Sequence, residues 1–423
     1  MKSIVIKILS LLTKLTLWRY QPRIIGITGS VGKTSTKEAI RHVLDKKLKV
    51  RASLGNYNNE LGVPLTVIGE KSGGKNIFKW LWIFTKAKAK FFFCAYPEVL
   101  ILEMGTDRPG DIAYLLGVVK RLDAAVLTDI GISHLEFFGT VEQLAKEKLS
   151  IVKGLNQSGV AVLNFDNQKI FEEKDQSKGK IMGYGFHEQA EVKISDYQII
   201  KNPDGQWGVN YKIHYKGTVV PFFLPNVVGL PVVYAFCAAT AVGLSFGLNL
   251  VEISEKGKSF RLPSGRLHII KGANSTTILD DSYNAAPAST MAALDALCEI
   301  ASGRKLVVLG TMAELGSATE EGLRMVSEKI HASKIDLVFL VGDQREILKK
   351  NLFQIGFQGQ IVDFITSTDA AEGVIKNLQA GDTILVKGSQ SARMERVVKK
   401  IMADPKQADR LLVRQSVDWI DKP

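Results

Sequence analysis

The sequence of 423 residues has few cysteines and no clean apolar run long enough to cross a membrane. The cysteines, too few for a disulfide framework or a cysteine-rich zinc site, are Cys94, Cys237 and Cys298. Their scarcity favours a reducing, cytoplasmic compartment. Lys7 and Lys14 interrupt the apolar N-terminus, and no small-residue cleavage site follows it. We therefore predict neither a membrane-spanning helix nor a secretory signal.

The chain also lacks an internal repeat, a long low-complexity tract and the signatures of zinc fingers or RNA-recognition domains. Apolar residues make up 46% and charged residues 23%, close to the averages of globular proteins, which excludes wholesale disorder. The net charge of +12 favours solubility and also attracts nucleotides, polyanions or anionic lipid. We expect no nucleic-acid partner. At about 150 residues per domain, the length predicts two to three domains.

Two stretches combine lysines with apolar or aromatic residues. Residues 1–20 have apolar residues at helical spacing: Ile4, Ile8, Leu11, Leu12, Leu15 and Trp18. Residues 71–96 hold six lysines, no acidic residue, and the aromatics Phe78, Trp80, Trp82, Phe84, Phe91, Phe92, Phe93 and Tyr96. This composition suits peripheral contact with an anionic membrane. The alternative is that both stretches pack on their own domain or on a partner chain, as apolar helix faces usually do.

Short apolar strands that alternate with helical patterns predict an α/β fold with a mostly parallel sheet. These strands are expected at residues 23–29, 98–105, 124–131 and 159–166. Residues 190–224 alternate like a small antiparallel sheet, and residues 231–247 form a helix of small residues. Past a break at residues 261–265, four further strands alternate with helices. We predict an amphipathic helix at 1–22, a central phosphate-loop domain at 23–262 and a Rossmann-like α/β domain at 263–423.

Residues 26–36, GITGSVGKTST, have the order strand, glycine-rich loop, lysine, threonine and helix that a phosphate-binding loop requires. Backbone N–H groups from Gly29 to Lys33 can converge on phosphate oxygens at the helix N-terminus. Lys33 can reach the outer phosphates, and the Thr34 hydroxyl can bind Mg²⁺. The strict G-x-x-x-x-G-K-[ST] pattern departs at Ile27, so a chance glycine-rich turn is the alternative.

Several further segments, in the same order along the chain, make it resemble the Mur ligases. They are GNYNNELGVPLT (55–66), LEMG (102–105), ISHLEFFG (132–139), GRL (265–267), DDSYNAAP (280–287), GTMAELG (310–316) and LVKGSQSARMERVV (385–398). The resemblance runs from about residue 23 to about residue 400 and is greatest to the branch that adds D-alanyl-D-alanine. Folylpolyglutamate synthases share the architecture but usually carry GKGS where this chain has GKTS.

The resemblance implies an ATP-dependent ligase that forms C–N bonds in peptidoglycan precursor synthesis, and so serves cell shape and division. The γ-phosphoryl group of ATP would pass to a muramoyl-peptide carboxylate, giving an acyl phosphate that an amine then attacks. The added group would be D-alanyl-D-alanine or a similar amino acid or dipeptide. The resemblance further implies small-molecule and peptide substrates, and we expect a monomer in the cytoplasm, with the inner face of the membrane as its place of peripheral contact.

Four residues carry the metal chemistry that the resemblance implies. Glu103 ends a strand at the sheet edge where α/β proteins bind ligands, and with Thr34 it matches the residues that hold one Mg²⁺. The counterpart of His134 binds a second Mg²⁺. Lys148 aligns with the lysine that the family carries as a carbamate, with Lys146 as a nearby rival. The alternatives are a solvated glutamate, a structural histidine and a surface lysine.

The remaining site residues are also carried over from the resemblance. ATP binding is expected at Thr28, Gly29, Ser30, Val31, Gly32, Lys33, Thr34, Ser35, Arg266 and Asp281. Substrate binding is expected at Asn58, Asn59, Tyr283, Asn284, Lys387, Ser389 and Arg393. Lys33 joins Glu103, His134 and Lys148 as a catalytic residue.

The chain departs from the family pattern in two ways. The family carries a whole uridine-binding domain before the loop, whereas only one helix precedes it here. The family motif G-x-H-N-x-x-N, which helps hold adenine, has Pro231, Val232 and Ala235 at its His and Asn places, and Asp129 stands where Asn is common. Two alternatives therefore stay open. One is a Mur-type ligase with a folate-like, polyamide-like or lipid-linked acceptor, and the other is a membrane-associated nucleotide-binding protein without ligase activity.

Overall fold

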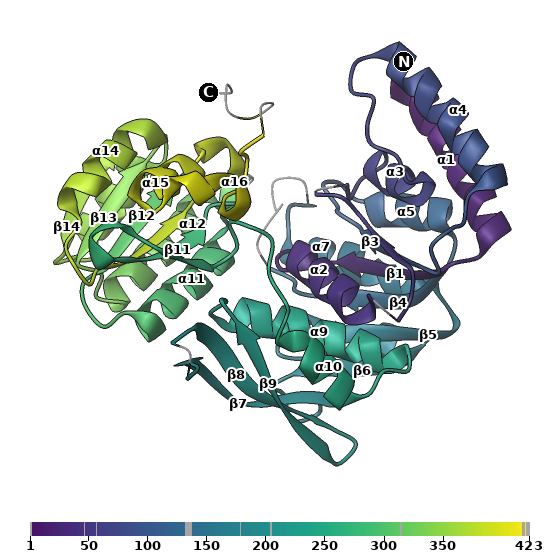
Figure 1. Ribbon diagram of the computed structural model, residues 1–423, viewed down its shortest axis with the longest axis horizontal. Helices are drawn as coiled ribbons and strands as arrows, with labels where there is room; N and C mark the ends of the chain where they lie inside the picture. The colour runs from purple at the N-terminus through teal and green to yellow at the C-terminus, as the bar shows by residue number, and fades with distance from the viewer. Residues whose placement is uncertain are drawn as a thin grey trace. The chain divides into compact units, whose positions relative to one another are not determined.

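The computed structural model describes residues 2–45, 47–55, 57–131, 138–177, 179–203, 205–313, 315–416 and 419. The chain divides into two compact units, each a sheet with helices packed on it (Figure 1). The first unit comprises Met1–Tyr197, Tyr211–Phe222 and Tyr234–Phe260, and the second comprises Gln198–Asn210, Phe223–Val233 and Arg261–Pro423. The predicted α/β fold class is confirmed.

A mostly parallel sheet runs in the order β2-β3-β1-β4-β5-β6-β7-β8-β9, with parallel pairing from β2 to β7. Its strands are β1 (Arg23–Thr28), β2 (Val50–Ala52), β3 (Val99–Glu103), β4 (Leu122–Leu127), β5 (Leu155–Asn164), β6 (Lys180–Gly185), β7 (Val192–Lys201), β8 (Trp207–Tyr215) and β9 (Thr218–Pro225). Only Lys216 and Gly217, both with positive φ, join β8 to β9, which makes that pair an antiparallel hairpin. The antiparallel strands thus extend the parallel sheet at one edge.

Helices cover both faces of this sheet. Its central strands are therefore apolar along their whole length. The helices are α1 (Lys2–Tyr20), α2 (Lys33–Leu44), α3 (Gly62–Ile68), α4 (Ile77–Phe93), α5 (Asp111–Val119), α7 (Val141–Leu149), α8 (Gln168–Glu172), α9 (Leu230–Ser245) and α10 (Leu250–Gly257). Apolar side chains of α3, α5 and α7 share one core with Ile24 of β1 and with Leu100 and Leu102, alternate residues of β3. Helix α2, with α10 against it, contacts β1, β2 and β3 outside that core.

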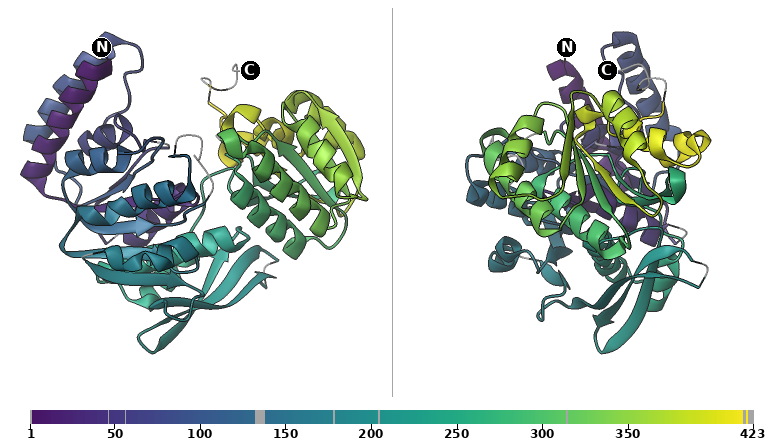
Figure 2. Two further views of the ribbon diagram at one scale, coloured as in Figure 1. Left: turned by 180° about the vertical axis from the view of Figure 1, so that it is seen from behind. Right: turned by 90° about the vertical axis from the view of Figure 1, so that its left-hand side faces the viewer.

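Helices α1 and α4 lie side by side and enclose a small core with α3 (Figures 1 and 2). The Tyr20 hydroxyl at the end of α1 donates a hydrogen bond to the Phe91 carbonyl of α4 over 2.8 Å. One face of each helix therefore packs on its own domain, as the second sequence interpretation predicts. Within the described residues, no helix is both long and apolar enough to cross a bilayer.

The second unit contains a sheet in the order β10-β11-β15-β12-β13-β14, parallel except for the β10–β11 pair. Its strands are β10 (His268–Lys271), β11 (Thr277–Asp281), β12 (Lys305–Gly310), β13 (Leu337–Val341), β14 (Gln360–Phe364) and β15 (Thr383–Lys387). Its helices are α11 (Pro287–Ile300), α12 (Thr319–Ala332), α13 (Arg345–Gln354), α14 (Ser367–Asn377), α15 (Glu395–Ile401) and α16 (Ala408–Leu411).

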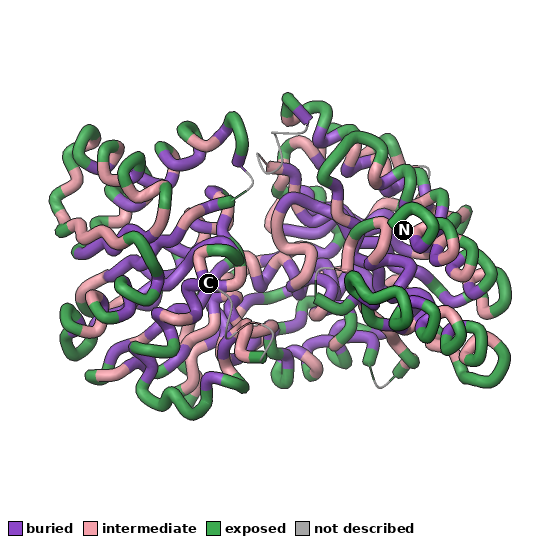
Figure 3. The backbone as a smooth tube through the Cα atoms, turned by 90° about the horizontal axis from the view of Figure 1, so that it is seen from above, coloured by how far each residue is buried: buried purple, intermediate pink, exposed green. Residues whose placement is uncertain are grey.

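Two separate hydrophobic cores show that helices cover both faces of this second sheet. Helices α11, α12 and α13 contribute to one core, and α14 and α15 contribute to the other. In both units the buried residues follow the strands, while exposed residues lie on the outer turns of helices (Figure 3). Ligands of such open α/β sheets bind at the carboxyl ends of the strands. The same edge of each sheet is therefore where the predicted site residues should be sought.

Candidate active site at the phosphate loop

The loop between β1 and α2 has the backbone shape that its glycines predict. Gly29 has a φ of +152°, and a Cβ there would lie 2.0 Å from the Thr128 hydroxyl oxygen. Gly32 has a φ of +84° and forms the N-cap of α2. Both positions lie in the left-handed region that glycine adopts at low cost. The loop therefore brings the N-terminus of α2 to the sheet edge with no side chain in the way.

The loop is fastened to the neighbouring strand end. The Ser30 amide donates to the Asp129 carbonyl over 2.8 Å, so this one of the predicted amide donors already has a protein partner. The Lys33 amine lies over the loop and donates to the carbonyls of Gly29, at 2.6 Å, and Ser30, at 3.2 Å. The other predicted ATP-binding residues at the strand and helix ends, Thr28 and Ser35, are buried.

Thr34 and Glu103 meet beside the loop, although they lie on different elements. The Thr34 hydroxyl at the start of α2 donates to Glu103 Oε2 at the end of β3 over 3.1 Å. Glu103 is buried, and its backbone amide is held by the Ser53 hydroxyl at 3.2 Å. The pairing of Ile27 with Glu103 in the β1–β3 register brings the carboxylate to the loop. Two hard oxygen donors thus lie together, as Mg²⁺ prefers.

The two predicted asparagines near the loop have different surroundings. Asn58 donates through Nδ2 to Glu103 Oε1 over 3.4 Å, so it belongs to the same cluster. Asn59 accepts hydrogen bonds from the amides of Leu61 and Gly62, at 3.2 and 3.0 Å, where α3 begins. The structure gives Asn59 a local role in the turn before α3. Substrate binding by either residue stays a prediction.

Lys148 lies on the inner side of α7, and its side chain is only 1% exposed. Burial lowers the pKa of its amine well below the usual range, and the positive charge of Lys33 lowers it further. The carboxylates of Asp129, Asp107 and Glu147 oppose that shift. The rival Lys146 is exposed on the same helix. The structure therefore distinguishes the two lysines, and the buried one is Lys148, which its spacing to the segment LSIV (149–152) also favours.

Asp129 and Asn167 are further polar residues near the loop. Asn167, just after β5, donates through Nδ2 to Asp129 Oδ1 over 2.8 Å and to the Ile130 carbonyl over 3.0 Å. Burial raises the pKa of the Asp129 carboxyl, while the Asn167 hydrogen bond and the charges of Lys148 and Lys33 act in the opposite direction. Asn167 belongs to none of the sequence motifs described above. Its place after a buried strand, like that of Glu103, is the signal that could have found it.

His134 lies outside the described residues, so its predicted role as a metal ligand stays a prediction. The residues at the adenine motif are placed. Pro231 and Val232 form the first turn of α9, and Ala235 follows one turn later. Val232 and Ala235 are buried apolar residues. In this chain these positions therefore contribute to packing and present no side-chain amide.

A second cluster of predicted residues lies at the carboxyl ends of β11 and β15 in the second unit. Asp281 and Lys387 are paired across the two strands, and the buried Lys387 amine donates to Asp281 Oδ2. The same amine donates to the Asn284 carbonyl over 3.0 Å. Asp281 Oδ1 accepts from the Leu267 amide over 3.2 Å. The predicted ATP-binding and substrate-binding positions of this unit are thus joined by direct contacts.

Tyr283 is flanked by cations in the same unit. The guanidinium of Arg266 lies 4.3 Å from the centre of its ring, and that of Arg414 lies 5.7 Å away. Arg266 Nε is buried and has no hydrogen-bond partner among the described residues. An unpaired buried guanidinium N–H is costly to maintain, which makes Arg266 a candidate for contact with an anionic ligand.

Arg393 and Ser389, like Lys387, are buried. Arg393 is buried and donates to Glu395 Oε1 over 2.7 Å and to the Trp419 carbonyl over 2.8 Å. The Ser389 amide donates to the Thr311 carbonyl over 2.9 Å, and its side chain is 1% exposed. These contacts stabilise the turn after β15. A substrate role for both residues stays a prediction.

A phosphate loop at the edge of a parallel sheet, a carboxylate beside its threonine and a second Rossmann-like unit define an α/β enzyme that uses a nucleoside triphosphate. The family model described as Mur ligase middle domain matches residues 27–78 and 85–243. The model described as Mur ligase, glutamate ligase domain matches residues 265–390. The chain belongs to the Mur ligase family and is an ATP-dependent ligase that forms C–N bonds.

The chain is similar to curated ligases along most of its length. It is 31% identical over 395 residues to the UDP-N-acetylmuramoyl-tripeptide--D-alanyl-D-alanine ligase of Bacillus subtilis, covering 93% of this chain and 79% of that protein. It is 30% identical to the Escherichia coli protein of the same name, covering 90% and 76%. The crystal structure of the MurF ligase from Thermotoga maritima in complex with ADP shares the fold, with a TM-score of 0.77, 24% identity and coverage of 96% and 84%.

Proposed function

We propose that this chain uses ATP to add D-alanyl-D-alanine to the tripeptide of UDP-N-acetylmuramoyl-tripeptide, a step in peptidoglycan precursor synthesis. The observation that carries the proposal is the 31% identity, along 93% of the chain, to a ligase named for that reaction. The contact of Thr34 with Glu103 beside the phosphate loop, and the buried Lys148, support it independently. A protein without ligase chemistry has little need for this cluster.

The proposed roles at the loop follow from charge and geometry. The amides at the N-terminus of α2 and the Lys33 amine would hold the phosphates of ATP and neutralise part of their charge. The Lys33 amine lies within that loop, where it donates to the carbonyls of Gly29 and Ser30. Thr34 and Glu103 would hold one Mg²⁺, which screens the negative charge of the transferred phosphoryl group.

The residues present fit a magnesium ion. Neighbouring ligands of an octahedral Mg²⁺, each at 2.0–2.1 Å, lie about 2.9 Å apart. The Thr34 hydroxyl and Glu103 Oε2 are 3.1 Å apart, close to that separation. Mg²⁺ in nucleotide sites is usually bound by one or two carboxylates together with substrate phosphates. One carboxylate and one hydroxyl beside a phosphate loop match that ligand set, and we assign a second ion to His134 and Lys148.

Lys148 fits the carbamate that we assign to it. Carbamate formation requires a neutral amine, because only the free electron pair on nitrogen attacks carbon dioxide. Burial and the charge of Lys33 lower the pKa of the Lys148 amine and so favour that neutral form. Attack on carbon dioxide releases one proton to solvent and converts the neutral amine into an anionic carbamate, which Lys33 and a divalent cation would both stabilise. Lys148 is therefore proposed as a metal ligand and a catalytic residue.

We assign the central domain, residues 23–262, to ATP and the C-terminal domain, residues 263–423, to contacts with both nucleotide and peptide. In the second unit, Arg266 has the unpaired N–H suited to phosphate, and Asp281 has the carboxylate suited to a ribose hydroxyl. Lys387 and the Tyr283–Asn284 turn lie against Asp281 and are proposed to face the peptide substrate.

The direct test follows inorganic phosphate and product mass with purified protein, ATP, Mg²⁺, bicarbonate, UDP-N-acetylmuramoyl-tripeptide and D-alanyl-D-alanine. Phosphate release that requires both substrates, with a product of the mass expected for the joined pair, supports the proposal. Turnover only with a folate, polyamide or lipid-linked acceptor would overturn the assigned substrate. Nucleotide binding without turnover on any acceptor would overturn the assigned reaction.

We further propose that the enzyme works in the cytoplasm as a monomer at the inner face of the membrane. ATP and uridine-linked precursors are cytoplasmic compounds, and the low cysteine content suits a reducing compartment. Size-exclusion chromatography with light scattering tests the oligomeric state. Fractionation of cells into supernatant and washed membranes tests the location.

A further inference from the structure

Helix α4 has an unpartnered apolar face in addition to the face that it buries. Trp80, Ile83 and Ala87 point into the small core shared with α1 and α3. On the opposite side, Phe78 is 77% exposed, Trp82 is 68% exposed, and other large apolar side chains are exposed as well. These others are Ile77, Leu81, Phe92 and Phe93. Spacings of three and four residues put Phe78, Leu81 and Trp82 on one stripe, and Phe92 and Phe93 lie on the same side near the end of the helix. A soluble protein rarely leaves so many large apolar side chains of one helix in water.

Helix α1, which lies beside α4, also has one buried face and one exposed apolar face. Val5, Leu9, Thr13 and Thr16 are buried against the domain. The outer face carries Trp18, which is 74% exposed, with Ile4, Leu11 and Leu15 also exposed. Because α1 and α4 lie side by side, their outer stripes belong to one helical pair, α1–α4 (Figures 1 and 2). The pair therefore has a buried side and an apolar side that no described residue covers.

The charged side chains on α1 and α4 themselves all have one sign. Residues 1–37 and 71–97 contain no aspartate or glutamate. Lys7 and Lys14 flank the exposed stripe of α1, and Lys79, Lys86 and Lys88 flank that of α4. Lys86 forms an ion pair with Glu70, in the turn after α3, over 3.3 Å. An apolar stripe bordered by cations is the pattern of helices that lie in the plane of an anionic membrane surface.

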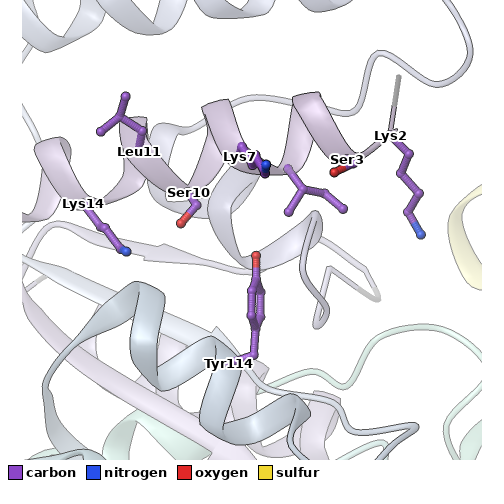
Figure 4. A pocket seen from close by; sticks show the side chains of 8 residues that line it. Lys2, Ser3, Lys7, Ser10, Leu11, Lys14 and Tyr114 are labelled. Carbon is purple, nitrogen blue, oxygen red and sulfur yellow. The ribbon is translucent and has the colours of Figure 1, made fainter.

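A groove beside α1 adds a basic recess to the same region. It has a volume of about 720 Å³ and lies between α1 and α5. Its lining residues are Lys2, Ser3, Ile6, Lys7, Ser10, Leu11, Lys14 and Tyr114. Figure 4 shows Tyr114 rising from α5 with its hydroxyl toward α1. Lys2 pairs with Glu60 at 3.0 Å, so the ammonium groups of Lys7 and Lys14 and the hydroxyl of Tyr114 are the groove donors that suit a phosphate group.

We propose that the α1–α4 pair docks the enzyme on an anionic phospholipid bilayer. Phe78, Trp82 and Trp18 would enter the boundary between headgroups and acyl chains, where amphipathic aromatic rings reside. The flanking lysines would contact lipid phosphates, and the groove beside α1 would receive a headgroup. This proposal specifies the surface that would hold the enzyme at the membrane, as proposed above. It does not depend on the ligase reaction.

The position of the pair relative to the family supports a role outside the shared catalytic architecture. The match to the middle-domain model begins at residue 27, after α1, and is interrupted at residues 79–84, within α4. Trp18, Leu81 and Trp82 thus lie outside the residues that this model matches, whereas Phe78, Phe92 and Phe93 lie within them. A second copy of this chain is the competing occupant, but two copies would bring like-charged lysine borders together, which opposes self-association.

The test is co-sedimentation of the full-length protein with vesicles of phosphatidylcholine alone or with added phosphatidylglycerol. We expect binding that requires phosphatidylglycerol and that weakens when NaCl rises from about 0.1 M to about 0.5 M. The test variant is Phe78→Ser/Trp82→Ser/Phe93→Ser. Its matched control alters three equally exposed apolar residues elsewhere: Val251→Ser/Phe353→Ser/Ile365→Ser.

We expect the test variant to lower vesicle partitioning by at least about tenfold, because membrane binding scales with buried apolar area. The control variant should bind like the unmodified protein. Lys7→Glu/Lys14→Glu should also lose binding, whereas Lys350→Glu/Lys376→Glu, with the same change in net charge, should not. Ligase turnover in solution and far-ultraviolet circular dichroism verify that each variant is folded.

Three results would overturn the proposal. The first is no sedimentation with phosphatidylglycerol vesicles, and the second is equal binding by the test variant. The third is self-association in analytical ultracentrifugation that the test variant abolishes, without vesicle binding, which would assign the surface to a second copy. Membrane binding by a protein that lacks turnover would leave this proposal standing and would overturn the ligase assignment alone.

Discussion

Replacement of Lys148 by alanine separates the stability of the fold from the chemistry of the site. The change removes three methylene groups and an amine from a side chain that is 1% exposed. Three buried methylenes contribute about 2.4 kcal/mol, at about 0.8 kcal/mol each. Removal of the buried amine also removes its desolvation penalty, which is several kcal/mol and therefore offsets a loss of this size. We therefore expect the free energy of unfolding at pH 7 to stay within about 2 kcal/mol of the unmodified protein.

The difference in free energy of unfolding between the unmodified protein and Lys148→Ala should change with pH in a definite direction. Because burial lowers the pKa of Lys148 in the folded state, the unfolded chain binds more protons between the folded and unfolded pKa values. The stability of the unmodified protein relative to Lys148→Ala should consequently rise as the pH increases from 7 toward about 10.5. Urea denaturation at several pH values, without bicarbonate, measures the difference.

Activity should respond far more strongly than stability. Without the proposed carbamate, an anion that faces the metal is lost, and removal of one such electrostatic group typically costs about a hundredfold to a thousandfold in rate. We expect a decrease in kcat of about a thousandfold, equivalent to about 4 kcal/mol of activation free energy. Phosphate release with both substrates is the assay. Formate or acetate in the buffer should restore part of the lost rate by occupying the vacated anion position.

Two further variants control this prediction. Lys148→Arg keeps a cation at the position but does not form a carbamate, so it should be as inactive as Lys148→Ala. Lys146→Ala alters an exposed lysine on the same helix and should keep full activity. In ¹³C-bicarbonate, a carbamate carbon resonance should be visible for the unmodified protein and for Lys146→Ala only. Full turnover of Lys148→Ala or Lys148→Arg would refute the reasoning.

Three other changes test the two clusters. Thr34→Val removes the hydroxyl that contacts Glu103 and should lower kcat at least about a hundredfold, with metal-free nucleotide binding kept in a calorimetric titration. Lys387→Met leaves the Asp281 carboxylate without its buried partner and should destabilise the protein by about 3 kcal/mol in thermal unfolding, whereas an unchanged midpoint would contradict the contact. Burial raises the pKa of Asp280 to about 7, so its contribution to stability is present at low pH and is lost as the pH rises through 7. Between pH 5 and pH 8 that loss amounts to about 3 kcal/mol, and Asp280→Asn should abolish it in urea titrations at the two pH values.

The phosphate loop and the contact between Thr34 and Glu103 show how much of the site can be predicted from local sequence. GITGSVGKTST fixes glycines where the backbone needs positive φ, and Glu103 ends an apolar run that folds as a buried strand. Strand ends of a parallel sheet share one edge, so the contact between Glu103 and Thr34 follows from the pattern. Asn167 obeys the same rule but carries no motif, and its hydrogen bond to Asp129 is seen only in the folded chain.

Helices α1 and α4 show the limit of the same reasoning. Their sequences are apolar on more than one side, so periodicity alone does not tell which face is buried. Packing against α3 decides it, by taking Leu9, Trp80 and Ile83 inward and leaving Trp18 and Trp82 in solvent. Packing on the domain is thus confirmed for one face of each helix, and contact of the opposite faces with a membrane stays a proposal.

By itself, the sequence determined the α/β class, the phosphate loop and the ligase family, because strand patterns and glycine positions act through the local backbone. The tertiary structure alone decided that Lys148 is buried while Lys146 is exposed, and that Lys387 meets Asp281. Burial and the pairing of charges depend on segments that are distant along the chain. No local pattern therefore determines which amine loses its water and which carboxylate gains a partner.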